Sequence, residues 1–143
     1  MTVKAILDLK GREVATVRPG ETLHNAAKML TEKKIGAIVI THEDGRIAGI
    51  LSERDIVGVV ARGNGGVLEK PVSSVMTAKV EVCAESNTIN QVMEVMTRRR
   101  FRHMPVEVDG KLAGIISIGD VVKRRMEEVE REAEQIRNYI AAG

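Results

Sequence analysis

The chain has 143 residues, and its 22 Lys and Arg residues against 20 Asp and Glu residues give a formal net charge of only +2 at pH 7. This near balance disfavours a nucleic-acid-binding or membrane-surface protein, since both usually carry a strongly basic patch. The single cysteine, Cys83, excludes an internal disulfide and a cysteine-rich zinc site, and it indicates a reducing, cytoplasmic location. No apolar stretch has the roughly 20 residues that cross a bilayer, so we expect a protein without a membrane span.

Two copies of one pattern follow each other, about 65 positions apart. The first copy opens with an extended segment at residues 14–17 and a helix from Thr22, whose apolar residues recur at helical spacing. Two apolar runs, residues 38–40 and 47–51, flank Asp44-Gly45, and this dipeptide predicts a hairpin turn because it tolerates positive φ angles. A second helix is expected from Ser52.

The second copy repeats these elements after a linker. Glycine-rich residues 61–66 predict that linker, and Pro71 is placed to open a short helix through residue 76. An extended segment at residues 80–83, a helix from Thr88, a hairpin and a helix from Ser117 then follow. We divide the chain into motif 1 (residues 1–62), a linker (63–72), motif 2 (73–126) and a C-terminal helical extension (127–143).

The last predicted helix carries a heptad-like pattern of apolar residues. Their spacing alternates between four and three over about two and a half heptads: Val122, Met126, Val129, Ala133, Ile136 and Ile140. A helix lying on its own domain and a helix packing against a second subunit both account for this spacing.

No sequence motif of a known catalytic site is present. The chain lacks the nucleophile elbow, the zinc-protease motif, the P-loop and the dinucleotide-binding glycine motif. Cys83 lies in an apolar strand, where a buried thiol is the usual state, and His24 and His42 are expected in solvent. We therefore expect a protein that is not an enzyme and carries no catalytic cofactor or metal.

A Ser-x-x-Asp motif follows the second hairpin strand of each copy, as Ser52 with Asp55 and as Ser117 with Asp120. One interpretation is a capping box, which stabilises a helix by about 1 kcal/mol. The other is a ligand site, because a helix N-terminus and a Ser hydroxyl suit a phosphate. The Asp can accept hydrogen bonds from both hydroxyls of a ribose, so serine and aspartate together match a ribonucleotide.

A basic segment precedes the first hairpin strand of the second copy. Arg98, Arg99 and Arg100 fit the solvated end of a helix, where cations suit the helix dipole. Arg102 and His103 flank a strand start, so at least one should face the cleft beside Ser117, and a phosphate there would favour a charged imidazole. Nucleic-acid binding through this segment is a third, disfavoured hypothesis.

The paired motifs, each closing with Gly-Ile-[Leu/Ile]-Ser-x-x-Asp, resemble a pair of CBS domains, the Bateman module. The resemblance covers nearly the whole chain. It implies an α/β fold of two CBS motifs (strand, helix, β-hairpin, helix) related by a pseudo-two-fold axis, here with a long C-terminal helix. It also implies two clefts that bind adenosyl compounds such as AMP, ADP, ATP, NAD or S-adenosylmethionine.

The resemblance further assigns roles to individual residues. It places ribose on Asp55 and Asp120, phosphate near Ser52 and Ser117, and the base against Val14-Ala15 or the Lys79 segment. The other residues expected at the site are Arg54, Lys79, Val80, Glu81, Arg102, His103, Met104 and Pro105. Binding is expected chiefly at Asp120, with Ser117, Arg102 and His103 beside it and Arg54 assisting from the first copy. Gly36-Ala37 offers no charge to a phosphate in the cleft of the first copy.

The sequence thus predicts a free-standing regulatory protein that binds an adenine nucleotide (AMP, ADP, ATP or NAD(H)) and signals to an unidentified partner, as in energy sensing. The resemblance implies a homodimer, which the C-terminal heptads would tie together. The alternative is a ligand-free dimerisation or assembly module in which Ser-x-x-Asp only caps helices.

Overall fold

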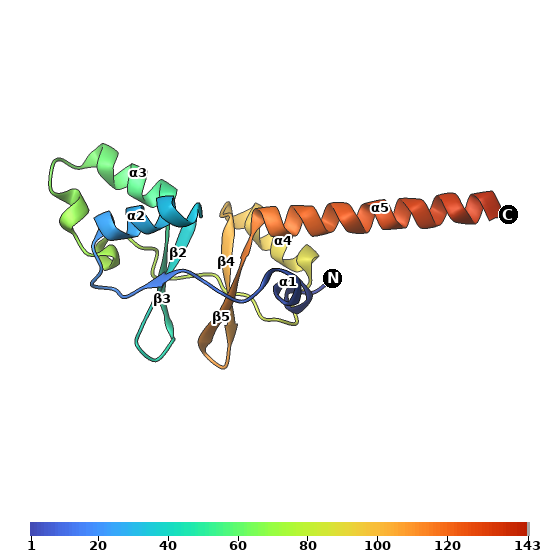
Figure 1. The fold of residues 1–143 in the computed structure, drawn as a ribbon, viewed down its shortest axis with the longest axis horizontal. Helices are drawn as coiled ribbons and strands as arrows, with labels where there is room; N and C mark the ends of the chain where they lie inside the picture. The colour runs from blue at the N-terminus through green and yellow to red at the C-terminus, as the bar shows by residue number, and fades with distance from the viewer. Residues whose placement is uncertain (143) are drawn as a thin grey trace.

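The structure is a computed structural model that describes residues 1–142, and it contains two similar modules side by side (Figure 1). The first module consists of β1 (Thr16–Val17), α2 (Leu23–Lys33), β2 (Ala37–Thr41), β3 (Ile47–Ser52) and α3 (Glu53–Arg62). The second module consists of α4 (Ile89–Arg99), β4 (His103–Val108), β5 (Lys111–Ser117) and α5 (Ile118–Ala142). The strands of both modules stand together in the middle, and the helices lie outside them (Figure 1).

The helices predicted from Thr22, Ser52, Thr88 and Ser117 are confirmed, and so are both hairpins. Thr22 and Thr88 cap α2 and α4, since each hydroxyl accepts a hydrogen bond from the backbone N–H three residues on, at 3.1 Å. β2 pairs antiparallel with β3, and β4 pairs antiparallel with β5. In the second turn Asp109 and Gly110 both have positive φ, which is the conformation that a tight two-residue turn requires.

The predicted extended segments are shorter than expected. In residues 14–17 only β1 is a strand, and it pairs parallel with β2. In residues 80–83 only Cys83 is bridged, to Val106. The helix expected after Pro71 is a single 3₁₀ turn, Val72–Ser74, and another such turn, Val67–Glu69, precedes it.

The stretch of chain that leads into each module packs against the core of the other module. The N-terminal helix α1 (Val3–Lys10), which the sequence reading did not anticipate, packs in the core of the second module. The 3₁₀ turns before α4 pack in the core of the first, where Val72 is fully buried. Residues within the sequence range of motif 1 therefore help to build the second module.

Two equivalent glycines make this exchange possible. A Cβ at Gly114 would lie 2.8 Å from the side chain of Leu7, and a Cβ at Gly49 would lie 2.5 Å from Met76. Both glycines occupy the same place in the hairpin of their module, and the absent side chain admits the incoming segment.

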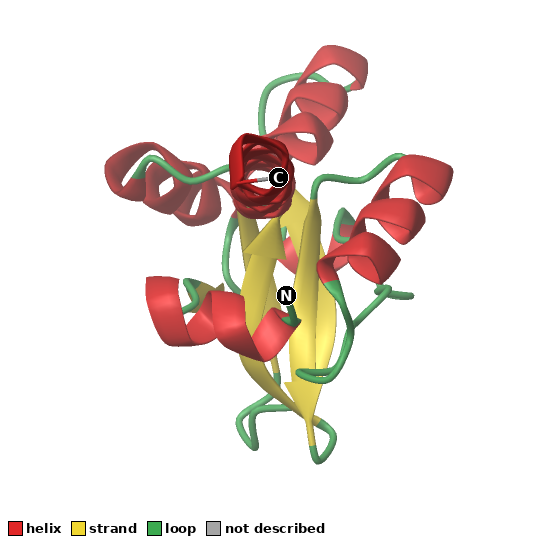
Figure 2. Cartoon of the chain, turned by 90° about the vertical axis from the view of Figure 1, so that its right-hand side faces the viewer, coloured by secondary structure: helices red, strands yellow, loops and turns green. Residues whose placement is uncertain are grey.

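The long helix α5 leaves the body of the molecule. Figure 2 looks nearly along α5 and shows the strands of both modules on one side of it. Within residues 1–142, no helix is long and apolar enough to cross a membrane. The cytoplasmic location stays a prediction.

Candidate functional site

Both Ser-x-x-Asp motifs form reciprocal caps at the start of a helix. At the N-terminus of α3, Asp55 Oδ2 accepts hydrogen bonds from the backbone N–H and the hydroxyl of Ser52, at 2.8 and 3.2 Å. At α5, Asp120 Oδ2 accepts from the backbone N–H of Ser117 at 2.9 Å, and Asp120 N donates to the Ser117 hydroxyl at 3.1 Å. Only one carboxylate oxygen of each aspartate takes part, so capping does not by itself prevent a second role.

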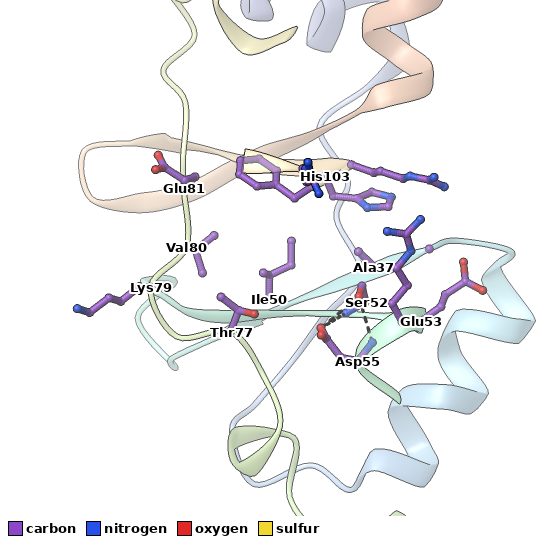
Figure 3. A pocket seen from close by; sticks show the side chains of 15 residues that line it. Ala37, Ile50, Ser52, Glu53, Asp55, Thr77, Lys79, Val80, Glu81 and His103 are labelled. Carbon is purple, nitrogen blue, oxygen red and sulfur yellow. Dashed lines mark hydrogen bonds between the residues drawn. The ribbon is translucent and has the colours of Figure 1, made fainter. Parts of the chain in front are cut away.

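A cavity of about 410 Å³ opens beside the first of these caps, a size typical of small-molecule sites. We call it the first cleft (Figure 3). It combines the end of β3 and the start of α3 with the segments that precede α4 and β4. Its lining residues are Gly36, Ala37, Ile50, Ser52, Glu53, Arg54, Asp55, Thr77, Lys79, Val80, Glu81, Arg100, Phe101, Arg102 and His103.

A second cavity, of about 740 Å³, lies beside the cap of the second module, and we call it the second cleft. It combines the end of β5 with the segment before β1 and the end of α2. Its lining residues are Lys10, Glu13, Val14, Ala15, Lys33, Lys34, Ile35, Gly36, Ala37, His103, Ile115 and Ser117. Each cleft therefore lies between the helix cap of one module and the entering segment, which is the stretch of chain that leads into the other module.

His103 lines both clefts and stands between the two modules. The pKa of His103 lies below its usual value, chiefly because the imidazole is buried. Its charged neighbours act in opposite directions: Glu53 and Asp120 raise the pKa, whereas Lys10 and Arg102 lower it. The imidazole is therefore neutral at pH 7, and an anion placed beside it would favour its protonation.

Gly36 leaves room for this imidazole. A Cβ at Gly36 would lie 3.1 Å from His103 Cε1 and 3.2 Å from Glu53 Oε1. Sequence reading noted only that Gly36-Ala37 brings no charge, whereas the structure gives Gly36 a steric role between the two clefts.

The two aspartates differ in their counter-ions. Lys10 Nζ donates to Asp120 Oδ2 at 2.7 Å and to the carbonyl oxygen of Ile115 at 2.9 Å. Burial of Asp120 raises its pKa, but the hydrogen bonds from Lys10 and Ser117 outweigh burial and hold the pKa below its usual value. Within residues 1–142, no such cation is paired with Asp55.

The structure groups the expected site residues differently from the sequence expectation. Arg102, together with the Lys79-Val80-Glu81 segment, lies with Asp55 rather than with Asp120. Arg54 lines this same first cleft. Val14-Ala15 lies with Ser117 in the second cleft. For Val14-Ala15 and the Lys79 segment the cause is the crossing of the entering segments, whereas Arg102 lines the first cleft from its place directly before β4.

Met104, Pro105 and Asp120 were expected at the site, but they line neither cleft. Asp120 adjoins the second cleft through its contacts with Lys10 and Ser117, which line it. Met104 is 2% exposed and belongs to the core of the second module, and Pro105 is buried too. Successive side chains of a strand point to opposite faces, so a strand that directs His103 to the clefts turns Met104 to the core.

Sequence reading missed Lys10, Lys33 and Lys34, three cations that line the second cleft. The only local signal for Lys10 was the pattern of Thr2 followed by Val3, Ile6 and Leu7, which indicates a capped amphipathic helix. Its contact with Asp120, more than 100 positions away, could not be predicted from the local sequence.

Comparison with known proteins identifies the family. The family model described as CBS domain matches the chain twice, at residues 6–62 and 72–127. The chain belongs to the CBS domain family. The two matches agree with the two modules. Both modules have the helix–hairpin–helix order of a CBS motif, preceded by the strand β1 in the first and by the single bridged residue Cys83 in the second.

Solved structures of this family share the fold. The CBS-domain containing protein ATU1752 from Agrobacterium tumefaciens is 51% identical, with a TM-score of 0.84 and coverage of 87% of this chain and 99% of that one. The CBS domain protein PAE2072 from Pyrobaculum aerophilum, solved in complex with AMP, is 27% identical, with a TM-score of 0.74 and coverage of 84% and 89%.

Among curated relatives, the mitochondrial CBS domain-containing protein CBSX3 of Arabidopsis thaliana is 33% identical over 129 residues. That match covers 86% of this chain and 62% of the relative. The chain thus spans slightly less than two thirds of that protein's length.

Proposed function

We propose that this CBS pair is a regulatory protein, not an enzyme, that binds an adenosyl compound in the first cleft, with its ribose on Asp55. The observation that carries the proposal is the Asp55 carboxylate at the cleft wall. One of its oxygens caps α3, and no cation of residues 1–142 is paired with it. Each charge-assisted hydrogen bond from a ribose hydroxyl contributes about 1.5–3 kcal/mol.

Phosphate groups of the ligand would be held by the cations of the first cleft. Arg54, Lys79, Arg100 and Arg102 line it, and the hydroxyl of Ser52 lies beside Asp55. Arginine binds phosphate with two parallel hydrogen bonds, which makes it suited to this task. A nucleotide of the AMP, ADP, ATP or NAD type has a ribose for the carboxylate and a phosphate for the cations of the cleft.

The base would lie against residues 79–81. Thr77 is fixed by two backbone hydrogen bonds to Ile50, of 2.9 and 3.0 Å. Beyond it, among the described residues, the backbone of Lys79, Val80 and Glu81 pairs with no other backbone group, so its N–H and C=O groups can recognise a base edge. Ile50 and Val80 add apolar surface for the ring.

A second, weaker site would lie in the second cleft, which Ser117 lines and which Asp120 adjoins through its hydrogen bonds with Ser117 and Lys10. A diol arriving at Asp120 meets a carboxylate already neutralised by Lys10, so the affinity there is expected to be lower. The AMP complex of PAE2072 supports the ligand class for this chain.

The test is calorimetry of the whole chain against AMP, ATP, NADH and S-adenosylmethionine, with Asp55→Asn and Asp120→Asn as a matched pair of variants. Asparagine keeps an oxygen for the cap but loses the charge, so both proteins should fold. We expect Asp55→Asn to weaken binding of the best ligand about tenfold or more, and Asp120→Asn to change it little. Equal weakening by both variants, or by Asp120→Asn alone, would contradict the assignment to the first cleft.

The competing function is a ligand-free assembly module. The two reciprocal caps favour this function, because they already give both aspartates a structural role. The two functions differ in a melting experiment. Ligand binding stabilises the folded chain by about 2.7 kcal/mol at a hundredfold excess over the dissociation constant, whereas an assembly module shows no shift with any of the four compounds.

Regulation would follow from the position of the first cleft between the modules. A ligand that contacts both α3 and the start of β4 favours the relative placement that suits it, and a partner protein that reads this placement is thereby controlled. Such coupling is typically 1–3 kcal/mol. We propose that the regulated partner is a separate protein and that two copies of this chain act together.

A further inference from the structure

The distal part of α5 packs against no other element among residues 1–142. From Glu130 to Ala142 every residue is exposed except Ala133, and Figure 1 shows this part extending beyond both modules. Its apolar side chains are as open as its polar ones, with Ile136 60% and Ile140 70% exposed. A long apolar stripe on a helix in water indicates a surface that is covered in the working protein.

The exposed apolar residues form one continuous seam along α5. The four-and-three spacing assigns Val122, Val129 and Ile136 to position d of a heptad, and Met126, Ala133 and Ile140 to position a. These positions are those that meet the facing helix in a coiled coil.

The charges that flank the seam select one arrangement. Position g holds Arg125 and Glu132, and position e holds Glu130 and Arg137. In a parallel pair, each g residue meets the e residue five positions later on the other helix. Arg125 then faces Glu130, and Glu132 faces Arg137, so both contacts are between opposite charges and each occurs twice.

We propose that residues 122–140 of α5 form a parallel, in-register, two-stranded coiled coil with a second copy of this chain. The proposal does not depend on the ligand or on the first cleft. It rests on the exposed seam and on charge complementarity between two identical helices.

An antiparallel pair with full overlap has the opposite charge pattern. It sets e against e and g against g, so that Lys123 faces Arg137, and Glu130 and Glu132 each face their own copy. An antiparallel pair shifted by one heptad relieves this repulsion, but it leaves part of the seam in water: Ile136 and Ile140 for a shift in one direction, Val122 and Met126 for a shift in the other. Only the parallel pair both covers the whole seam and joins opposite charges.

The body of the molecule leaves this surface accessible. Val121 is fully buried against the second module, and it marks the inner face of α5. At about 100° per residue the seam lies on average about a quarter turn from Val121. A second copy related by a two-fold axis along the coil therefore carries its modules on the far side, away from those of the first.

The first experiment is sedimentation velocity of the whole chain over a range of concentrations. We expect a dimer, and we expect Ile136→Asp to raise its dissociation constant roughly tenfold or more, because a carboxylate enters the seam. Arg131→Glu is the matched control on the outer face of the same helix, and it should leave the dimer unchanged. A monomeric wild type, or a dimer that Ile136→Asp does not weaken, would overturn the proposal.

Charge exchange tests the parallel orientation. Glu132→Arg and Arg137→Glu each place like charges across the pair, and each should weaken the dimer roughly two- to fivefold, while the double variant should restore it. In an antiparallel pair Arg137→Glu would face Lys123 and tighten the dimer, and that result would refute the orientation.

A cysteine at the tip of α5 gives an independent answer. In the parallel pair Ile140→Cys faces its own copy and should oxidise to a covalent dimer. In the antiparallel pair the two cysteines lie about 27 Å apart along the axis and cannot join. The native Cys83 is buried, so the wild-type chain provides the background. A dimer in which Ile140→Cys does not cross-link would overturn the proposed register.

Discussion

Replacing Lys10 by Met tests the link between the N-terminal helix and the second module. The variant keeps the aliphatic stem of the side chain and removes only the ammonium group that contacts Asp120. We expect the chain to fold as before and to lose stability.

The magnitude follows from the geometry of the ion pair. The Nζ and Oδ2 atoms are 2.7 Å apart, and the two side chains are 28% and 24% exposed. At an effective dielectric constant of about 20 this separation gives an attraction of about 6 kcal/mol. Desolvation of both charges and about 2 kcal/mol of lysine rotamer entropy cancel most of it. A net loss of about 1–2 kcal/mol at pH 7 remains, above the usual value for an exposed pair.

A double-mutant cycle measures this quantity. Urea unfolding of the wild type, Lys10→Met, Asp120→Asn and the double variant gives the coupling energy directly, and we expect about 1 kcal/mol. Asparagine keeps an acceptor for the backbone N–H of Ser117, so the cap of α5 is preserved. A coupling energy below about 0.3 kcal/mol, within the error of additivity, would refute the reasoning.

The pH dependence of the same cycle has a definite sign. The pKa of Asp120 is depressed in the folded chain, so its contribution is fully present above the unfolded value of about 3.9. It is lost as the pH falls through the lower, folded pKa. The Asp120 part of the difference between wild type and Lys10→Met should therefore be constant from about pH 5 to about pH 9, above which lysine side chains begin to lose their charge, and it should disappear in strong acid.

Three further predictions concern other parts of the chain. Burial keeps the pKa of His103 low, and a bound phosphate would raise it, so nucleotide affinity measured by calorimetry should increase as the pH falls from 8 to about 6. A flat pH profile would exclude His103 from phosphate binding. Burial raises the pKa of Cys83 to about 12, so a thiol reagent at pH 8 should label it only after unfolding; rapid labelling of the native chain would contradict this. Gly114→Ala should cost about 1–3 kcal/mol in thermal unfolding, because its Cβ would overlap Leu7, whereas Gly119→Ala has room and should cost little; equal losses would contradict the steric argument.

Features set by neighbours along the chain could be predicted from the sequence. The caps at Thr22 and Thr88 each depend on a hydroxyl and an N–H group three residues apart, so they could be predicted from the local sequence. The second hairpin turn could be predicted too, since Asp109-Gly110 can adopt the two positive φ angles required. The first loop is longer, residues 42–46, and of Asp44 and Gly45 only the glycine has a positive φ. The repeat then fixed the order of elements in both modules.

The composition of the clefts could not be predicted in the same way. Asp55 and Arg102 line the same cleft from different modules, and Lys10 reaches Asp120 from the far end of the chain. Periodicity and propensity describe one element at a time, so they assign a side chain to a face but not to a partner on another module. Family resemblance supplied the residue types of the site, whereas their distribution over two clefts required the three-dimensional crossing.

That crossing also explains why two copies of one motif produce two unequal clefts. Leu7 fills the space at Gly114, and Met76 fills the equivalent space at Gly49, so the two entering segments dock alike. Three residues after each of these side chains stands a lysine, Lys10 or Lys79. Lys10 is at the end of a helix and reaches Asp120, whereas Lys79 lies in irregular chain and lines the first cleft without pairing with Asp55 among the described residues. The difference between a helix and an irregular segment at the same docking point therefore leaves one carboxylate open to a ligand and neutralises the other.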